Sequence, residues 1–480
     1  MQKVLNFIDG KWKEPSTGKW LENVNPSTGE VFSFLPDSNK EDVAIAVTCA
    51  NKAFQYWSKT SAEQRSLYLN KIADLIEERQ HEFAHLESQD QGKPVGLAEK
   101  MDIARAIQNF RFFAGAILHH ENESTQMAEN SFNYVLRKPV GVAGLISPWN
   151  LPLYLLTWKI APALACGNTV VCKPSEFTSM TAALLCEVAQ EVNLPPGVLN
   201  MVFGLGQNVG DPLVRHPDVP LISFTGGTAT GRKIMEASAE NFKKISLELG
   251  GKNPNIIFAD CDLNEAVRTT IRSSFLNQGE ICLCGSRIYV EDKIYDQFME
   301  MFVAQTQKLK VGNPKEEDTF MGALVSKAHL DKVKDFIEIA KSEGGQILTG
   351  GKAPQLPKEL QNGFFLEPTI IVGLPENSKC IQEEIFGPVV TVSKFQNFSE
   401  VMEKANAVKY GLSATVWTKN LKTAHEAAAN LKAGTVWINT WLARDLRVPF
   451  GGMKASGLGR EGGKHSIDFF TEMTNVNVRF

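Results

Sequence analysis

Apolar residues in the first third of the chain follow the spacing of amphipathic helices. They recur every three or four positions, which places them on one helical face. The pattern covers three segments, residues 43–54, 69–76 and 101–120. Ser38 with Glu41 before the first segment, and Ser61 with Gln64 before the second, fit the capping box, in which both side chains satisfy free backbone N–H groups. We therefore expect three helices in this part of the chain.

The middle of the chain changes to short apolar runs separated by helical stretches such as 181–192. Gly, Pro or Asn bounds these runs, which predicts buried strands over residues 140–146, 169–172, 199–203 and 221–224. A second series follows Gly250, with strands predicted over residues 256–258, 287–290, 387–392 and 415–417 and a helix over 327–343. This alternation predicts an α/β fold with parallel, doubly wound sheets, which bind ligands at the carboxyl ends of their strands. We expect two such domains with a cleft between them. Residues 473–480 alternate apolar and polar side chains and could form an edge strand that pairs with another subunit.

Composition and charge exclude several classes of protein. Of the 480 residues, 43% are hydrophobic and 22% are charged, which is ordinary for a globular chain. The 50 basic and 54 acidic side chains give a net charge of −4, so we expect neither nucleic acid nor a membrane as a partner. Residues 139–158 carry no charge and are about as long as a membrane span. Pro148 and Pro152 would break such a helix.

Cysteine usage and the N-terminus favour a reducing compartment. The eight cysteines are too sparse for a disulfide framework and show no zinc-binding spacing, so no metal site is expected. The first residues show no secretory signal. We expect a soluble, cytoplasmic protein whose cysteines are reduced.

Glu248 and Cys282 are the residues whose surroundings favour catalysis. Glu248 lies in an apolar run, where an unpaired carboxylate is costly to bury and its pKa tends to rise. That suits a general base, and an outward-facing strand residue is the alternative. Cys282 follows a glycine turn that could present an ionised thiol. The spacing does not choose between Cys282 and Cys284, and two buried cysteines would explain it as well.

Three segments that follow predicted strands could hold a nucleotide. Residues 204–210 nearly match the dinucleotide fingerprint but have one residue too many between the last two glycines. The helix that begins after residues 225–227 offers free N–H groups to a phosphate. Lys173 and Glu176 could bind ribose hydroxyls, although a solvated surface pair is the more common explanation.

Seven segments carry a family resemblance when they are taken in order along the chain. They are residues 148–150 (PWN), 173–176 (KPSE), 224–226 (FTG), 248–252 (ELGGK), 277–282 (NQGEIC), 383–388 (EEIFGP) and 449–452 (PFGG). Together they resemble the aldehyde dehydrogenase superfamily over essentially the whole chain. The resemblance implies a Rossmann-like cofactor domain over residues 1–121 and 140–250 and an α/β catalytic domain over 251–449. It also implies a small β oligomerisation arm over 122–139 and 467–480, and a homodimer or homotetramer.

The resemblance implies NAD(P)-dependent oxidation of an aldehyde to a carboxylic acid, with three catalytic residues. Cys282 would be the nucleophile that forms a thiohemiacetal with the aldehyde. The side-chain amide of Asn150 and the backbone N–H of Cys282 would form the oxyanion hole. Glu248 would activate the water that hydrolyses the thioester, and Cys284 would be a bystander.

NAD would bind through residues that match the family's cofactor site. These are Ser147, Trp149, Lys173, Ser175, Glu176, Gly206, Phe224, Gly226, Gly227, Leu249, Glu384 and Phe386. The Glu176 carboxylate would repel a 2′-phosphate, which favours NAD over NADP. The chain departs from the family pattern at Gly227, where many relatives have Ser, and at Glu280, where Gln is frequent. Both departures could alter cofactor affinity.

The substrate tunnel that the resemblance implies is mostly apolar. Its lining would include Leu151, Tyr154, Leu155, Trp158, Cys284 and Phe450. Arg105 and Arg444 would lie at its mouth, where they could bind a substrate carboxylate. A surface ion pair, such as Arg444 with Asp445, is the alternative for either arginine.

The sequence context of these residues resembles one branch of the superfamily more specifically. Residues 101–105, 109–113, 147–154 and 443–446 resemble the 2-aminomuconic semialdehyde dehydrogenases, a branch that includes hydroxymuconic relatives. This implies an unsaturated semialdehyde that carries a carboxylate, namely 2-aminomuconate or 2-hydroxymuconate 6-semialdehyde, in kynurenine or other aromatic catabolism. One alternative is a broader aldehyde dehydrogenase acting on betaine aldehyde, retinal or aliphatic aldehydes, although two arginines disfavour the betaine cation. The other is a non-catalytic NAD-binding member, which the intact catalytic residues disfavour.

Overall fold

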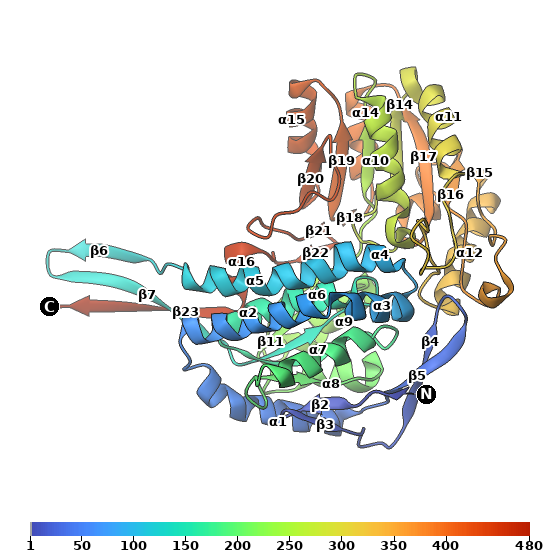
Figure 1. The fold of residues 1–480 in the computed structure, drawn as a ribbon. Coiled ribbons are helices and arrows are strands. Elements are labelled where there is room, and N and C mark those ends of the chain that lie inside the picture. Colours follow the sequence, from blue (N-terminus) through green and yellow to red (C-terminus); the bar gives the residue numbers. More distant parts are fainter. Residues whose placement is uncertain (1) are drawn as a thin grey trace.

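Residues 2–480 are described by a computed structural model and form two α/β lobes, with a narrow β-arm that projects from one of them (Figure 1). The first lobe contains an eight-stranded sheet in the order β22-β12-β11-β8-β9-β10-β2-β3. Its strands are β2 (Asn6–Ile8), β3 (Lys11–Lys13), β8 (Val142–Ile146), β9 (Thr169–Lys173), β10 (Leu199–Met201), β11 (Leu221–Thr225), β12 (Lys244–Glu248) and β22 (Gly457–Leu458). The strands from β12 to β10 are parallel, and antiparallel strands close both edges.

Helices cover both faces of this sheet because successive strand residues bury their side chains on opposite sides. In β8, Leu145 packs into the core of one face and Ile146 into the core of the other. The first face carries α2 (Ala62–Glu78), α3 (Gln80–Gln91), α5 (Ala104–Leu118), α6 (Pro152–Ala165), α7 (Met180–Glu191) and α16 (Gly463–Phe469). The second face carries α1 (Lys40–Trp57), α8 (Asp211–Arg215) and α9 (Thr228–Ala239). The prediction of a doubly wound sheet is confirmed.

The second lobe contains a seven-stranded sheet in the order β15-β16-β17-β14-β13-β19-β20. Its strands are β13 (Pro254–Ile257), β14 (Arg287–Glu291), β15 (Gln346–Thr349), β16 (Thr369–Val372), β17 (Val389–Phe395), β19 (Ser413–Trp417) and β20 (Thr435–Ile438). All neighbouring pairs are parallel except β15 with β16. One face carries α10 (Leu263–Phe275) and α11 (Tyr295–Thr306), and the other carries α12 (Lys327–Ser342), α13 (Lys379–Gln382), α14 (Phe398–Asn406) and α15 (Leu421–Asn430).

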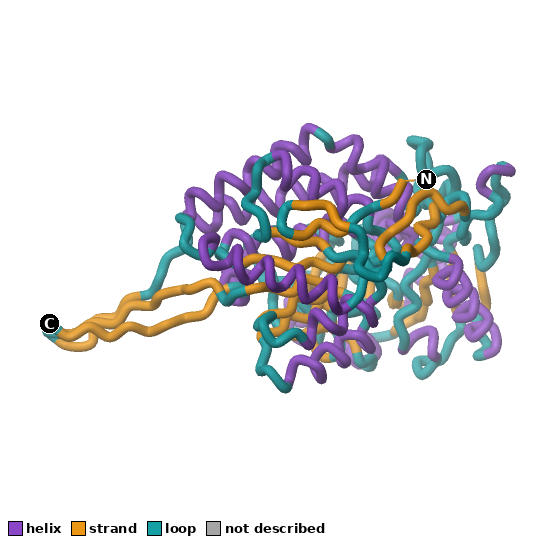
Figure 2. The backbone as a smooth tube through the Cα atoms, turned by 90° about the horizontal axis from the view of Figure 1, so that it is seen from below, coloured by secondary structure: helices purple, strands orange, loops and turns teal. Residues whose placement is uncertain are grey.

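The arm is a three-stranded antiparallel sheet that extends away from the two lobes, with the C-terminus at its tip (Figure 2). It consists of β6 (Ser124–Ala128), β7 (Ser131–Pro139) and β23 (Thr471–Arg479). The last strand therefore pairs with β7 of its own chain over its whole length, and its other edge has no partner strand among residues 2–480. Two smaller sheets complete the described strands: β1 (Gln2–Lys3) with β5 (Glu30–Pro36) and β4 (Trp20–Asn25), and β18 (Tyr410–Gly411) with β21 (Met453–Lys454).

The helices of the first third differ from the expectation in two respects. Helix α1 is capped by Asn39 with Asp42, because the hydroxyl of Ser38 is already hydrogen-bonded in the core; the predicted box at Ser38 is wrong, and the second box is confirmed. Helix α3 was not predicted, and α4 (Val95–Leu97) with a π-helical segment, Ala98–Ile103, precedes α5. Among residues 2–480, no helix combines the length and apolar character that a membrane crossing needs.

Phe110 and Leu118 lie on the same helix, α5, but differ in burial. Phe110 is fully buried, whereas Leu118 is 45% exposed. We expect Phe110→Ala to lower the free energy of unfolding by about 3–5 kcal/mol, because loss of the ring leaves a cavity in a packed core. The control Leu118→Ala should change it by less than about 0.5 kcal/mol. Urea denaturation followed by tryptophan fluorescence measures both values, and equal effects would contradict the packing described for α5.

Candidate active site

Three adjoining cavities lie at the carboxyl ends of the parallel strands of the first lobe. The edge cavity, of about 580 Å³, is lined by the loops after β8 and β9 and by the start of α9. The central cavity, of about 250 Å³, lies between the lobes and shares Trp149 with the edge cavity. The arginine cavity, of about 140 Å³, is lined by Arg105 and Arg444 and shares Cys282 and Glu248 with the central cavity. Cys282 therefore lies where the two smaller cavities meet.

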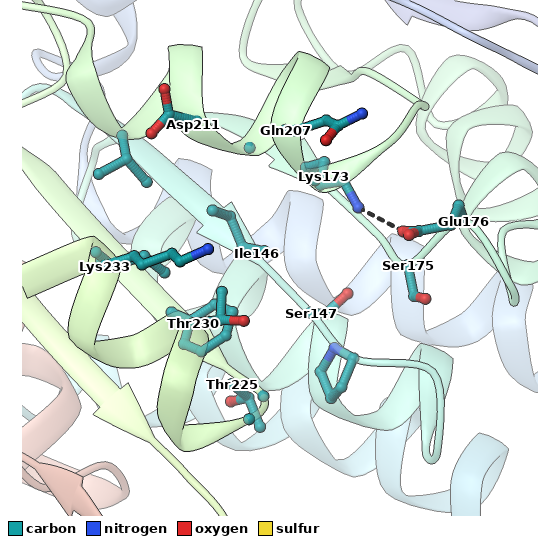
Figure 3. A pocket seen from close by; sticks show the side chains of 18 of the residues that line it. Ile146, Ser147, Lys173, Ser175, Glu176, Gln207, Asp211, Thr225, Thr230 and Lys233 are labelled. Atoms are coloured by element: carbon teal, nitrogen blue, oxygen red, sulfur yellow. Dashed lines mark hydrogen bonds and ion pairs between the residues drawn. The ribbon is translucent and has the colours of Figure 1, made fainter. Parts of the chain in front are cut away.

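Polar side chains from the loop after β8, from the carboxyl ends of β9 and β11, and from α8 and α9 line the edge cavity (Figure 3). The Nζ atom of Lys173 lies 2.9 Å from a carboxylate oxygen of Glu176. The hydroxyl oxygens of Ser147 and Thr225 are buried and have no hydrogen-bond partner among the described residues. The predicted cofactor residues that line this cavity are Ser147, Trp149, Lys173, Ser175, Glu176, Gly206, Phe224, Gly226 and Gly227.

Helix α9 begins at the edge cavity with free backbone N–H groups. Gly227 precedes its first residue, and no side chain caps it. Such an N-terminus favours an anion through its N–H groups and the helix dipole. Thr230 and Lys233, from the first two turns, also line the cavity, although the sequence did not single them out. The unpaired hydroxyls, the Lys173–Glu176 pair and this helix start fit the hydroxyl and phosphate groups of a dinucleotide.

Cys282 reaches the central cavity from a left-handed turn. After α10, Asn277 and Gln278 have φ angles of 52° and 57°, and Gly279 has a φ of 71°. A Cβ atom at Gly279 would clash with the backbone oxygen of Gly387, so only glycine fits there. The backbone oxygen of Cys282 accepts a hydrogen bond of 2.7 Å from Asn253 Nδ2. These contacts set the position of the thiol.

Asn150 lines the central cavity together with Cys282. Its Nδ2 atom donates a hydrogen bond of 2.8 Å to the backbone oxygen of Glu280. An amide nitrogen carries two hydrogens, so one N–H of Asn150 stays available to a ligand in the cavity.

The remaining predicted cofactor residues, Leu249, Glu384 and Phe386, also line the central cavity. Glu384 accepts a hydrogen bond of 2.8 Å from the backbone N–H of Gly251. Phe386 packs edge-on against Trp149, with ring centroids 5.3 Å apart. The twelve residues expected to bind a cofactor are thus divided between two adjoining cavities.

Glu248 ends β12 with a buried carboxyl group, so the alternative of an outward-facing residue is wrong. Neither carboxyl oxygen has a hydrogen-bond partner among the described residues. Burial raises the pKa of Glu248 well above its usual range; the nearby Glu461 raises it further, while Lys159 and Arg444 lower it. A carboxyl group with a raised pKa is a stronger base once it is ionised, which suits proton abstraction.

The pKa values do not single out Cys282 over Cys284 as the nucleophile. Burial raises the pKa of each to about 12; for Cys282, Glu384 and Glu248 add to the rise and Arg444 opposes it. Their placement differs, because Cys282 lines both smaller cavities and Cys284 lines neither. The expectation that Cys284 lines the substrate tunnel is therefore wrong. Its side chain is buried in an apolar cluster of the interior instead.

The residues predicted to bind substrate all line the arginine cavity. They are Arg105, Tyr154, Trp158, Arg444 and Phe450, and the expected Leu151 and Leu155 line it as well. The Arg444 guanidinium donates a hydrogen bond of 2.7 Å to the Tyr154 hydroxyl and lies 3.8 Å from the centre of the Phe450 ring. The Arg105 guanidinium lies 5.7 Å from the Tyr154 ring centre.

No carboxylate of the described chain pairs with either arginine of this cavity. Asp445, the expected alternative partner of Arg444, binds Arg447 at 2.6 Å instead. The ion-pair alternative is therefore wrong for Arg444. Both guanidinium groups keep their charge available to a ligand.

Several lining residues escaped the sequence analysis. His329 and Lys332 of α12 line the central cavity, and Glu461 lines the arginine cavity. His329 Nε2 lies 2.6 Å from the backbone oxygen of Phe386. Each of these side chains sits in an ordinary amphipathic or glycine-rich segment, which provides no local signal that could have identified it.

Comparison with known proteins identifies the family of the chain. A model of the aldehyde dehydrogenase family matches residues 12–476. The chain is 55% identical to the 2-aminomuconic semialdehyde dehydrogenase of Danio rerio, over 99% of this chain and 98% of the relative. It is 47% identical to the 2-aminomuconic 6-semialdehyde dehydrogenase of a Pseudomonas species, over 100% of this chain and 98% of the relative. Its fold matches the NAD+ complex of aldehyde dehydrogenase from Bacillus cereus with a TM-score of 0.97 and 39% identity, over 100% of this chain and 97% of that one. As its motifs predicted, the chain belongs to the aldehyde dehydrogenase family.

Proposed function

We propose that this aldehyde dehydrogenase uses NAD to oxidise a semialdehyde that carries a carboxylate, such as 2-aminomuconate or 2-hydroxymuconate 6-semialdehyde. One observation carries the proposal: Arg105 and Arg444 line the cavity that contains Cys282, and neither pairs with a carboxylate of the described chain. Relatives named for 2-aminomuconic and 2-hydroxymuconic semialdehydes support the same class of substrate.

The arginine cavity suits an unsaturated chain with an acidic end. A guanidinium group binds a carboxylate through two parallel hydrogen bonds, which fixes the orientation of the ligand. The rings of Tyr154, Trp158 and Phe450 supply apolar walls for the carbon chain. A substrate held by its carboxylate at the arginines directs its aldehyde group toward Cys282.

Cys282 releases its proton to solvent and attacks the aldehyde carbon as a thiolate. A C–S bond is made, and the carbonyl oxygen of the resulting thiohemiacetal becomes an oxyanion. The free N–H of Asn150 and the backbone N–H of Cys282 stabilise this oxygen. Removing one such donor in other enzymes costs about 2.7–4 kcal/mol of transition-state stabilisation. The thiohemiacetal carbon then loses a hydride, which leaves a thioester on Cys282.

Glu248 supplies the base for the second half of the reaction. Its carboxylate removes a proton from the water that attacks the thioester carbon, and the C–S bond breaks to give the acid and Cys282. Because burial and Glu461 raise the pKa of Glu248, the ionised form accepts this proton readily.

The edge and central cavities hold the cofactor in this proposal. The free N–H groups at the start of α9 bind the pyrophosphate, Lys173 and Glu176 bind a ribose, and Glu384 and Phe386 orient the nicotinamide side. NAD, when bound, supplies the acceptor for the hydride. The Glu176 carboxylate disfavours the extra phosphate of NADP.

The proposal extends to assembly and location. The arm formed by β6, β7 and β23 projects from the body and leaves one edge of β23 unpaired, which supports a role in forming a homodimer or homotetramer. We place the enzyme in the cytoplasm, in the breakdown of aromatic compounds such as those of the kynurenine pathway. We also propose the cofactor domain, catalytic domain and arm with the boundaries expected from the sequence. Strand β22, near the C-terminus, pairs with β12 and so extends the sheet of the cofactor domain.

The substrate class is tested by NADH formation with 2-aminomuconic and 2-hydroxymuconic semialdehydes, betaine aldehyde, retinal and hexanal. We expect the acidic semialdehydes to be preferred. Arg105→Ala and Arg444→Ala should each raise KM for them by roughly 10-fold or more, because each loses a charge-assisted hydrogen bond. Arg447→Ala is the matched control, since Arg447 lies on the same loop but binds Asp445. Equal activity with hexanal, together with an unchanged KM in both arginine variants, would refute the substrate assignment.

The choice of nucleophile is tested by replacing each cysteine of the pair. Cys282→Ser should lower kcat by about 10³-fold or more, because the serine hydroxyl is a far weaker nucleophile than a thiolate. Cys284→Ser should leave kcat largely unchanged, since Cys284 lines neither cavity. The reverse result in steady-state assays would identify Cys284 as the nucleophile.

The resting state of the thiol is tested by alkylation of the free enzyme with iodoacetamide across pH 7–10. Because its pKa is raised to about 12, Cys282 should react slowly at neutral pH and faster as pH rises. Glu384→Gln removes a charge that raises this pKa and should speed alkylation by roughly 2- to 10-fold, since one pKa unit changes the thiolate fraction about tenfold. Glu383→Gln is the control, since the neighbouring Glu383 side chain is 40% exposed and pairs with Lys409. An equal effect of both variants would contradict the electrostatic cause.

A further inference from the structure

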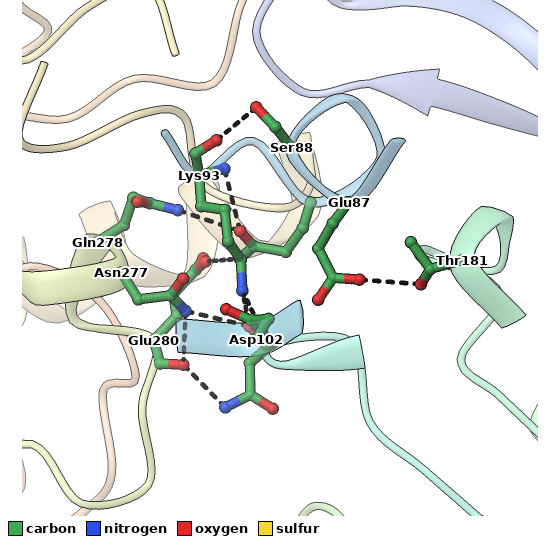
Figure 4. Close-up of polar contacts among 10 residues, drawn as sticks. Glu87, Ser88, Lys93, Asp102, Thr181, Asn277, Gln278 and Glu280 are labelled. Atoms are coloured by element: carbon green, nitrogen blue, oxygen red, sulfur yellow. Dashed lines mark hydrogen bonds and ion pairs between the residues drawn. The ribbon is translucent and has the colours of Figure 1, made fainter. Parts of the chain in front are cut away.

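Lys93 lies outside the three cavities and pairs with Asp102 (Figure 4). It also contacts the backbone of Asn150, the proposed oxyanion donor. Lys93 follows α3, and its side chain is fully buried. Its Nζ atom donates one hydrogen bond of 2.9 Å to the backbone oxygen of Asn150 and another of 2.8 Å to Asp102 Oδ1. Lys93 lines none of the three cavities, so neither substrate nor cofactor binding explains it.

The charge of Lys93 is balanced inside the protein. Asp102, which is also fully buried, is its ion-pair partner. Glu87 lies beside Asp102; burial raises the pKa of Glu87 well above its usual range, and Asp102 raises it further. Glu87 Oε1 and Asp102 Oδ2 have no other partner in the described structure, and one proton on Glu87 lets these two groups bond to each other. Lys93 is then the cation of the cluster, Asp102 is its anion, and Glu87 is uncharged.

Other contacts hold Asn150 on its remaining sides. Asn277 Nδ2 donates a hydrogen bond of 3.1 Å to the same backbone oxygen that Lys93 binds. Asn150 Nδ2 donates to the backbone oxygen of Glu280, whose carboxyl group in turn accepts from Gln91 Nε2 at 2.7 Å. Glu280, a departure from the family pattern, therefore contacts the side-chain amide of Asn150 and lines neither of the cofactor cavities.

The position of Asp102 links this support to the substrate end. Asp102 belongs to the π-helical segment Ala98–Ile103, a type of segment that recurs at functional sites. The preceding residue, Met101, lines the arginine cavity, and so does Arg105 one turn later. The Lys93–Asp102 pair thus joins the segment that directly precedes α5, the helix of Arg105, to the loop that carries Asn150.

We propose that Lys93 is a positioning residue, which holds the Asn150 backbone so that the free amide N–H points at the aldehyde oxygen. The inference rests on the proposed function, because it assumes that Asn150 is an oxyanion donor. Without Lys93, one hydrogen bond from Asn277 would be left to hold this carbonyl. A donor displaced by about 1 Å can cost on the order of 100-fold in rate.

A double-mutant cycle between Lys93→Met and Asn150→Ala in the full-length enzyme tests the proposal. Lys93→Met should lower kcat/KM for the aldehyde by roughly 10- to 100-fold when Asn150 is present. In the Asn150→Ala background it should lower it by less than about threefold, because the donor that Lys93 positions is gone. The dissociation constant of NAD, measured by quenching of tryptophan fluorescence, should not change.

The possible outcomes separate the inference from the proposed function. An equal loss in both backgrounds overturns the inference, since a merely structural lysine would act independently of Asn150. If Asn150→Ala itself has no effect, the proposed oxyanion role fails. If Lys93→Met does not fold, the variant Lys93→Met/Asp102→Leu, which removes both buried charges, replaces it in the double-mutant cycle. Asn200→Ala, which removes buried hydrogen bonds in β10, is the control and should leave kcat/KM unchanged.

Discussion

Three consecutive residues in the left-handed backbone conformation, Asn277 to Gly279, join α10 to the segment that carries Cys282. For Asn277 and Gln278 this conformation costs about 1–2 kcal/mol each, and buried hydrogen bonds offset that cost. Gln278 donates to a backbone oxygen of the second lobe, and Asn277 donates to Asn150 of the first. The turn is therefore stabilised by contacts with both lobes. The position of the nucleophile relative to Asn150 therefore depends on how the lobes meet.

Burial controls the charges around this turn. It raises the pKa of Glu248 well above its usual range and that of Cys282 to about 12, which favours uncharged groups in the resting site. Charges that develop in such a dry site interact strongly with fixed donors, so a preoriented amide is effective there. The carboxylate of the proposed substrate needs its own cations, and Arg105 and Arg444 provide them in the arginine cavity. The arginines thus bind the carboxylate at one end of the substrate, and Cys282 reacts with the aldehyde at the other.

Local patterns identified most strands but not every helix. The strand predicted over residues 169–172 is β9 (Thr169–Lys173), because a short apolar run between turn residues has few other conformations. Helix α3 was missed because its buried face includes Glu87, Asp90 and Gln91, so it shows no apolar stripe. The same polar face supports Asn150, and a pattern built on apolar residues could not have found it.

The sequence by itself determined the α/β fold, the segment that carries Cys282 and the family, because periodicity, turn chemistry and motif order are written in neighbouring residues. The tertiary structure decided which polar groups meet. Lys93 binds Asn150 across 57 positions of sequence, and Arg444 binds Tyr154 across 290. Cys282 and Cys284 have equally raised pKa values, yet only Cys282 lines the cavities. These outcomes depend on distances between remote segments, and local sequence contains no measure of those distances.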